Sequence, residues 1–194
     1  MKSIRLLLYL SLFGASFSLS SCNDCETTVA QFENGDSNWT VYNSGDTLEM
    51  VDNGTTPDSI RVFVNTRVNS DPIPGDGFGP ADVCIEQYYT RRTSVMQHSD
   101  RRFPALTVIA VRMPDSIRVS LVVAGKAELP IPNIDTPDHA TYPLEGVIYS
   151  DVYDVVNPDS SATGVSRILF NREYGFLQVA YLNKRTLTRL PPTP

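Results

Sequence analysis

The sequence predicts an all-β protein built on an antiparallel sheet of about ten strands, arranged as a sandwich, a barrel or a half-barrel. Short runs rich in β-branched and aromatic residues recur along the chain, and several alternate between apolar and polar positions. Gly, Pro, Asn and Asp separate these runs at short intervals, and strong helical periodicity is absent. Successive strands joined by short turns fold as antiparallel sheets.

The first organised segment is expected to be a hairpin. Trp39–Tyr42 and Thr47–Val51 are both β-prone, and the turn-forming residues 43–46 separate them. Ser59–Val68 follows with apolar side chains at every second position, which is typical of a half-buried strand.

The middle of the chain combines a loop with three expected strands. Asp71–Pro80 is too rich in Pro and Gly for a helix or a ladder strand. Val83–Gln97 favours a strand because of its β-branched and aromatic residues, although nothing in it forbids a helix. Ala105–Arg112 and Ile117–Ala124 form the clearest pair, joined by a turn at residues 113–115.

The last third is expected to continue the sheet. The prolines of Leu129–Pro143 indicate an extended connection across a surface, and Gly146–Val156 favours a strand. A hairpin is predicted for Val165–Asn171 and Gly175–Leu182, and a final edge strand is predicted for Thr186–Leu190.

One short internal repeat is present. Pro57–Val62 recurs as Pro114–Val119, with the same six residues in the same order. It indicates either a duplication or a shared way of entering a strand, in which Pro-Asp sets a turn and alternation then begins. The lack of longer similarity favours the second interpretation, and both copies should mark the start of a strand.

The chain begins with the layout of a secretory signal peptide. Lys2 and Arg5 give a positive start, and Leu6–Phe17 is an apolar run broken only by small residues. That run is too short to cross a membrane as a helix, which takes ~20 apolar residues.

The end of the leader, Leu19-Ser20-Ser21-Cys22, resembles a bacterial lipobox, in which the cysteine is acylated and becomes the first mature residue. A plain signal peptide with an incidental cysteine is the alternative. Several acyl chains, of the palmitate type, would anchor the protein stably. Asn23 stands where an inner-membrane retention signal would have Asp, so the outer membrane is expected. We therefore divide the chain into a signal peptide (1–21), a lipidated Cys22 with its tether (22–37) and one all-β domain (38–194).

The mature chain is acidic. Removal of the 21 leader residues leaves 173 of the 194, a comfortable size for one domain. The leader holds two of the 16 Lys and Arg residues and none of the 22 acids, so the net charge falls from −6 to −8. This balance argues against nucleic acid as a partner and leaves the lipid anchor as the expected contact with the membrane.

Lipidation of Cys22 would leave Cys25 and Cys84 as an even pair in an oxidising compartment, where a disulfide is expected. The alternative is two unpaired thiols, with Cys84 buried as a small apolar residue.

Several of these stretches resemble small lipoproteins of Bacteroidetes-type bacteria. The similarity lies in Trp39–Tyr42 with Gly45–Leu48 near the start, and in Val147–Tyr153, Leu169–Asn171 and Tyr174–Leu177 near the end. It implies an exported, compact β-sheet domain and supplies no catalytic residue.

The resemblance also implies possible O-glycosylation, since such bacteria can modify Ser or Thr between Asp and an apolar residue. Three sites fit this pattern, with Thr47, Ser59 and Ser116 as acceptors.

Candidate catalytic or metal-binding groups are sparse. The two histidines, His98 and His139, lack a recognisable nucleophile motif, and His139 is expected to be exposed in the proline-rich connection. Asp71, Asp76 and Asp82 flank a Gly-rich loop, but their spacing does not match an EF-hand and favours an acidic turn. We expect no metal and no cofactor.

One basic cluster stands out in this acidic chain. Its aromatic rings and guanidinium groups could hold a sugar or an acidic partner, although a solvated strand and turn is favoured. The cluster comprises Tyr88, Tyr89, Arg91, Arg92, Arg101 and Arg102.

The sequence thus favours an exported, lipid-anchored, non-catalytic protein with a role in binding or in envelope structure, with a glycan or an envelope protein as partner. A hydrolase acting on glycans, with carboxylates from several strands, is one alternative. A subunit of a surface assembly is the other.

Overall fold

The computed structural model describes residues 26–53, 58–73, 85–98 and 103–190. The chain divides into two compact units, residues 1–28 with 72–87 and residues 29–71 with 88–194. In the described part of the first unit, the backbone N–H of Ile73 donates to the carbonyl of Gln87 at 3.0 Å. The second unit contains the hydrophobic cores of the described residues and the hollow discussed below.

The described chain is almost entirely β-structure. It contains β1 (Glu26–Val29), the 3₁₀ turn η1 (Asp36–Trp39), β2 (Thr47–Asp52), β3 (Asp58–Pro72), β4 (Ile85–His98), β5 (Leu106–Met113), β6 (Ser116–Val123), β7 (Ala127–Pro130), β8 (His139–Leu144), β9 (Val147–Val156), the helical turn α2 (Ser160–Thr163), β10 (Val165–Asn171), β11 (Gly175–Tyr181) and β12 (Thr186–Arg189).

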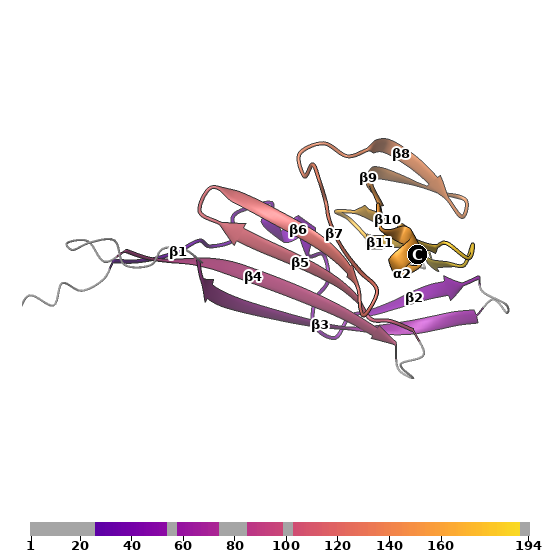
Figure 1. Cartoon of the computed structure of the whole chain (residues 1–194), viewed down its shortest axis with the longest axis horizontal. Coiled ribbons are helices and arrows are strands. Elements are labelled where there is room, and N and C mark those ends of the chain that lie inside the picture. The colour runs from indigo at the N-terminus through magenta and orange to yellow at the C-terminus, as the bar shows by residue number, and fades with distance from the viewer. Residues whose placement is uncertain (1–25, 54–57, 74–84, 99–102, 191–194) are drawn as a thin grey trace, which may run out of the picture. The chain divides into compact units, whose positions relative to one another are not determined.

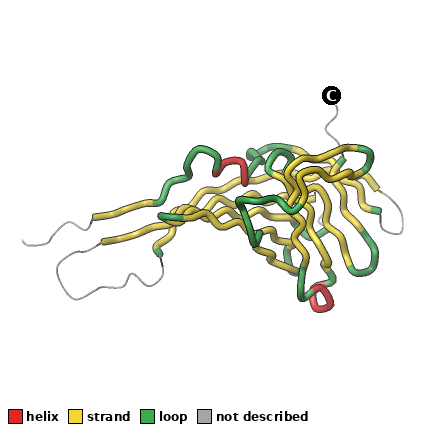
Figure 2. Tube along the Cα trace, turned by 90° about the horizontal axis from the view of Figure 1, so that it is seen from above, coloured by secondary structure: helices red, strands yellow, loops and turns green. Residues whose placement is uncertain are grey.

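These twelve strands form one sheet within the described residues, in the order β7-β6-β5-β4-β3-β2-β12-β11-β10-β9-β8, with β1 paired to β4 outside this path. Two meanders of sequential strands are thus joined by the antiparallel pair β2–β12. In the second unit the sheet curls into a half-barrel (Figures 1 and 2). The predicted all-β antiparallel class is confirmed, and the half-barrel is the form that it takes.

The inner face of the curled sheet holds the main core, to which both meanders contribute. Alternate residues of β5 and β6, such as Val108 and Leu121, are fully buried there. The large rings of this core come from the other meander and from the segment Trp39–Tyr42. Trp39 lies 5.0 Å from Tyr153, and Phe170 lies 5.8 Å from Phe176, between ring centroids. Such aromatic pairs add stability beyond the apolar area that they bury.

A second, smaller core covers the opposite face of β10 and β11. Leu169 and Leu177 point away from the main core and pack with Tyr149 and Val152 of β9. Asp151, with φ of 51°, interrupts the alternation of β9 between those two residues, so both face the same side. This irregularity lets one strand contribute to two cores.

Most predicted strands are confirmed. β5 and β6 pair from Leu106↔Val123 to Met113↔Ser116, with Pro114-Asp115 as the turn, and β10 pairs with β11 as the expected hairpin. The segment that could have been helical is strand β4. Both copies of the six-residue repeat enter a strand, at the start of β3 and of β6.

The predicted first hairpin is wrong in one of its arms. β2 forms as expected, but its partners are β3 and β12. Trp39 ends η1, and Trp39 and Tyr42 are each 3% exposed beneath the sheet. Burial of these two rings in the core therefore overrides the strand propensity of the segment. Strand β1 (Glu26–Val29) lies within the segment predicted as a tether.

Two predictions about the last third of the chain are also wrong. β12 is a central strand between β11 and β2, because a distant part of the chain covers its free side. Conversely, the last residues of the expected extended connection form strand β8, which pairs with β9 and includes Pro143. A proline is tolerated in β8 because that strand lies at the edge of the sheet.

Candidate functional site

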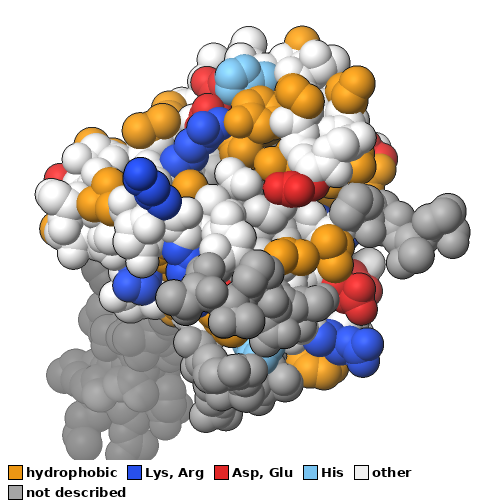
Figure 3. All heavy atoms as spheres, turned by 90° about the vertical axis from the view of Figure 1, so that its right-hand side faces the viewer, with side chains coloured by type: hydrophobic (Ala, Val, Ile, Leu, Met, Phe, Trp, Pro, Cys, Tyr) orange, Lys and Arg blue, Asp and Glu red, His pale blue; other side chains and the backbone are white. Residues whose placement is uncertain are grey.

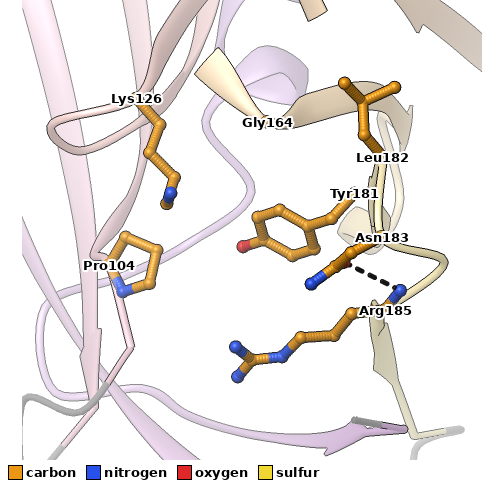
Figure 4. Close-up of a pocket in the computed structure, with 7 residues that line it drawn as sticks. All are labelled: Pro104, Lys126, Gly164, Tyr181, Leu182, Asn183 and Arg185. Carbon is orange, nitrogen blue, oxygen red and sulfur yellow. Dashed lines mark hydrogen bonds between the residues drawn. The ribbon is translucent and has the colours of Figure 1, made fainter. Parts of the chain in front are cut away.

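A half-open hollow of about 230 Å³ lies in the second unit where four connections meet (Figure 4). It is smaller than the ~300–1,000 Å³ of pockets for drug-sized ligands, so it suits one ring or a small acid. Its lining residues are Pro104, Lys126, Gly164, Tyr181, Leu182, Asn183 and Arg185.

The turn between β11 and β12 supplies most of the polar groups. The side-chain Oδ1 of Asn183 accepts the backbone N–H of Arg185 at 3.1 Å, and Lys184 adopts a left-handed φ of 66°. Two backbone hydrogen bonds close this turn: the N–H of Tyr181 donates to the carbonyl of Arg185 at 2.9 Å, and the N–H of Lys184 donates to the carbonyl of Tyr181 at 3.0 Å. An Asn that bonds two residues ahead is a common device for tight turns. Since Oδ1 is used, the amide Nδ2 is the donor turned toward the hollow (Figure 4).

The opposite wall comes from the turn between β6 and β7. Lys126 donates its backbone N–H to the carbonyl of Val123 at 2.9 Å, and Gly125 takes a positive φ of 69°. This turn holds Lys126 at the rim, and Figure 4 shows its side chain extending toward the space between Pro104 and Tyr181. Gly164, the left-handed cap of α2, bonds the backbone of Leu182 and completes the wall.

Arg185 is held by a carboxylate behind the hollow. Its Nε and Nη2 donate to the two oxygens of Asp52 at 2.7 and 2.6 Å, and this hydrogen-bonded pairing raises the pKa of Arg185. The guanidinium carbon lies 4.8 Å from the ring centroid of Phe103 and 5.9 Å from that of Tyr181. A bidentate carboxylate and two rings fix this side chain in one orientation. Nη1 lies outside the pair with Asp52.

The electrostatic balance of the hollow is positive. Asp52 offsets the charge of Arg185, and no ion pair among the described residues involves Lys126. Burial raises the pKa of Tyr181, so its hydroxyl stays protonated and can donate. The lining contains no carboxylate or imidazole among the described residues. The hollow thus offers several donors and one uncompensated cation, which is an arrangement for binding an acceptor.

The predicted basic cluster is divided between two faces of β4, as far as the structure describes it. Arg91 lies over the Tyr89 ring at 5.6 Å and donates to its hydroxyl at 3.2 Å. Tyr88 and Arg92 occupy the alternate positions, and Arg92 donates to Thr40 at 3.2 Å. Successive side chains of a strand point to opposite faces, so these four residues do not share one surface. Arg101 and Arg102 lie outside the described residues.

Arg112 of β5 contacts the same segment of the chain as Arg92 does. Arg112 forms an ion pair with Glu33 and lies 3.7 Å from Asp36, between charged atoms. Together these two arginines hold η1 and the residues on either side of it against the sheet. Thr90, across from Arg112, is 3% exposed and its hydroxyl has no partner among the described residues.

The prediction for His139 is wrong about its backbone and right about its exposure, since its side chain is 38% exposed. His139 begins β8 instead of lying in an open connection, and its Nε2 is 3.3 Å from Oδ2 of Asp154. The other oxygen of Asp154 is 2.8 Å from Nε of Arg167, whose Nη2 donates to Tyr142 at 2.9 Å. This cluster could not be predicted from the sequence, because its members come from three different strands. His98 is buried and contacts the ring of Phe103 at 5.3 Å.

The remaining predicted sites are partly described. Thr47 and Ser116 are exposed at the first positions of β2 and β6, where an acceptor hydroxyl would be accessible. Ser59 lies in β3, and its side chain is outside the described set. Cys22, Cys25 and Cys84 lie outside the described residues, as do Asp76 and Asp82.

Within the part of the chain that the structure describes, no group of three or more His, Cys, Asp or Glu side chains is placed to hold a metal ion. The same residues include no helix with the length and apolar character to cross a membrane. On the face shown in Figure 3, acidic and basic side chains are interspersed with hydrophobic ones. Comparison with protein-family models, curated proteins and solved structures gives no match to this chain.

Proposed function

We propose that this chain is an exported, lipid-anchored protein whose all-β domain binds a small polar ligand without transforming it. The observation that carries the proposal is the hollow around Lys126, Tyr181 and Arg185, in which a buried carboxylate already orients the guanidinium. Preorganised donors around a small concave space favour binding, because little ordering remains when the ligand enters.

The described lining has no carboxyl group, and this separates the proposed function from a glycan hydrolase at the same place. Hydrolysis of a glycosidic bond generally uses two carboxyl groups about 5 to 10 Å apart on either side of the bond. The hollow offers Tyr, Lys, Asn and Arg side chains, and the carboxylate that contacts this lining, Asp52, is engaged by Arg185.

The site is tested by titrating the mature protein with a panel of small sugars and acids while following backbone and side-chain NMR signals. We expect one class to shift the signals of Lys126, Tyr181 and Asn183 in a saturable way. Shifts confined to other regions, or cleavage of glycan substrates by the same preparation, would contradict the proposal.

Anchoring is tested separately in cells. Cys22→Ala should move the protein from the membrane to the soluble fraction, because the acylated residue is removed. Continued retention in the membrane would exclude the lipid anchor and leave the ligand site unaffected. Recovery of the anchored protein in a defined complex would instead favour a subunit of a surface assembly.

A further inference from the structure

The side-chain donors of the hollow come from two separate connections and surround one space. Lys126 enters from the β6–β7 turn, and Asn183 and Arg185 enter from the β11–β12 turn (Figure 4). Nδ2 of Asn183 faces inward because its Oδ1 is bound to the backbone of Arg185, and Nη1 of Arg185 lies outside its pair with Asp52. A ligand that presents several acceptors would satisfy these groups together.

The charge of the site favours one negative charge over two. Among the described residues at the hollow, Asp52 neutralises Arg185, so the excess positive charge is that of Lys126. Asp52 would also repel a second negative charge placed near Arg185, because Asp52 lies directly behind the guanidinium. The site is therefore better matched to a carboxylate than to a phosphate dianion.

The rest of the lining favours a compact carbon skeleton with hydroxyl groups. Pro104, Leu182 and the ring of Tyr181 provide apolar surface, while the Tyr181 hydroxyl and the Asn183 amide provide hydrogen bonds. Sugar rings combine apolar C–H faces with hydroxyl groups in this way. The volume of about 230 Å³ admits one such ring and no longer chain.

We propose that the hollow binds an acidic monosaccharide, a single sugar ring with one carboxylate, and that Lys126 is the residue that selects the acid. This inference rests on the proposed ligand-binding function and narrows it to one chemical class. The carboxylate lies against the ammonium group of Lys126, and the ring hydroxyls lie toward Asn183 and Tyr181.

The test compares four probes by NMR titration of the mature protein: glucuronate, glucose, acetate and inorganic phosphate. Glucuronate is expected to bind with the lowest Kd, and Lys126→Gln is expected to weaken it about threefold to fivefold, since Lys126 is exposed and an exposed ion pair contributes up to ~1 kcal/mol. Lys184→Gln is the matched control, because Lys184 lies in the β11–β12 turn beside the hollow but is not one of the residues that line it. It should leave the Kd within about twofold.

Each other result overturns the inference in a recognisable way. Equal binding of glucose and glucuronate would remove the selection for an acid while leaving the ligand site intact. Equal binding of acetate would show that the sugar ring is not recognised, and tighter binding of phosphate would show that a dianion is preferred. If none of the four probes shifts the NMR signals of the hollow, and no other sugar or acid of the wider panel does so, the proposed ligand-binding function itself is wrong.

Discussion

Tyr42 occupies the space that any side chain at Gly175 would need. Its ring and hydroxyl lie against the glycine so closely that a Cβ placed there would overlap them. The hydroxyl accepts the backbone N–H of Phe176 at 2.7 Å and donates to the carbonyl of Tyr174 at 3.2 Å. The 3₁₀ turn region is thereby joined to the β10–β11 hairpin, some 130 residues further along the chain.

Gly175→Ala is therefore expected to lower the free energy of unfolding by about 2 to 4 kcal/mol, since it adds overpacking to a backbone φ of 77°. Urea unfolding of the mature domain measures this loss. Gly146→Ala is the control, because its φ is 80° and nothing lies within 4 Å of the added Cβ. The control should lose about 1 kcal/mol, and equal losses in both variants would show that Tyr42 is not the cause.

Tyr42→Phe should cost about 1 to 3 kcal/mol at pH 7. The variant keeps the ring but leaves the buried N–H of Phe176 without its acceptor. Hydrogen exchange of this amide should become faster in the variant than in the native protein. An unchanged exchange rate would show that another acceptor takes over.

The same residue predicts a dependence of stability on alkaline pH. Burial raises the pKa of Tyr42 to about 12, from an ordinary value near 10, so the folded state holds the proton more tightly than the unfolded state. Its contribution is fully present below pH 10 and is lost as the pH rises from about 10 to about 12. Tyr42→Phe should thus lose less stability over this interval than the native protein. Some loss will remain, because burial also raises the pKa values of Tyr149, Tyr153 and Tyr181.

The ion pair of Asp52 and Arg185 should have a larger coupling free energy than an exposed ion pair in the same sheet. A double-mutant cycle with alanine at both positions is expected to give a coupling of about 1 to 2 kcal/mol, because the Asp52 side chain is only 9% exposed and the geometry is bidentate. Glu49 and Arg61 are 3.8 Å apart and more than half exposed, so their cycle should give about 0.5 kcal/mol or less. Similar values for the two cycles would contradict this.

The cysteine pair remains a prediction. Intact mass measurement of the exported protein without reductant should show Cys25 and Cys84 joined, with a gain of two hydrogens after reduction. Labelling of both thiols before reduction would show that they are free. A disulfide closing a loop of this length would contribute up to about 4 kcal/mol in the chain-entropy model.

The strands predicted correctly from the sequence are those that pair with the next strand along the chain and are joined to it by a short turn. Alternation in β5 and β6 follows directly from burial of every second residue, and the Pro-Asp turn between them is a short-range signal. Trp39–Tyr42 could not be assigned in this way, because its conformation depends on Tyr153 and Gly175, far along the chain.

The hollow was missed for the same reason. Pro104, Lys126 and Gly164 each lie in a different connection, and none belongs to a motif with fixed spacing. The one local signal was the turn residue Asn183, which indicates a tight turn but not what faces it. The basic cluster, by contrast, was visible as a run of arginines, and strand alternation then separated its members.

The joining of the two meanders at β2 and β12 has a kinetic consequence. Every other neighbouring pair along the main strand order links strands that follow each other in the sequence, whereas Leu187 faces Asp52 across 134 intervening residues. Closing so long a loop loses chain entropy before the contact is gained, and non-local pairings of this kind slow folding. The two meanders are thus expected to collapse as separate hairpin stacks first. The rate-limiting event is then the pairing of β12 with β2, which consists of three residue pairs from Leu187↔Asp52 to Arg189↔Met50.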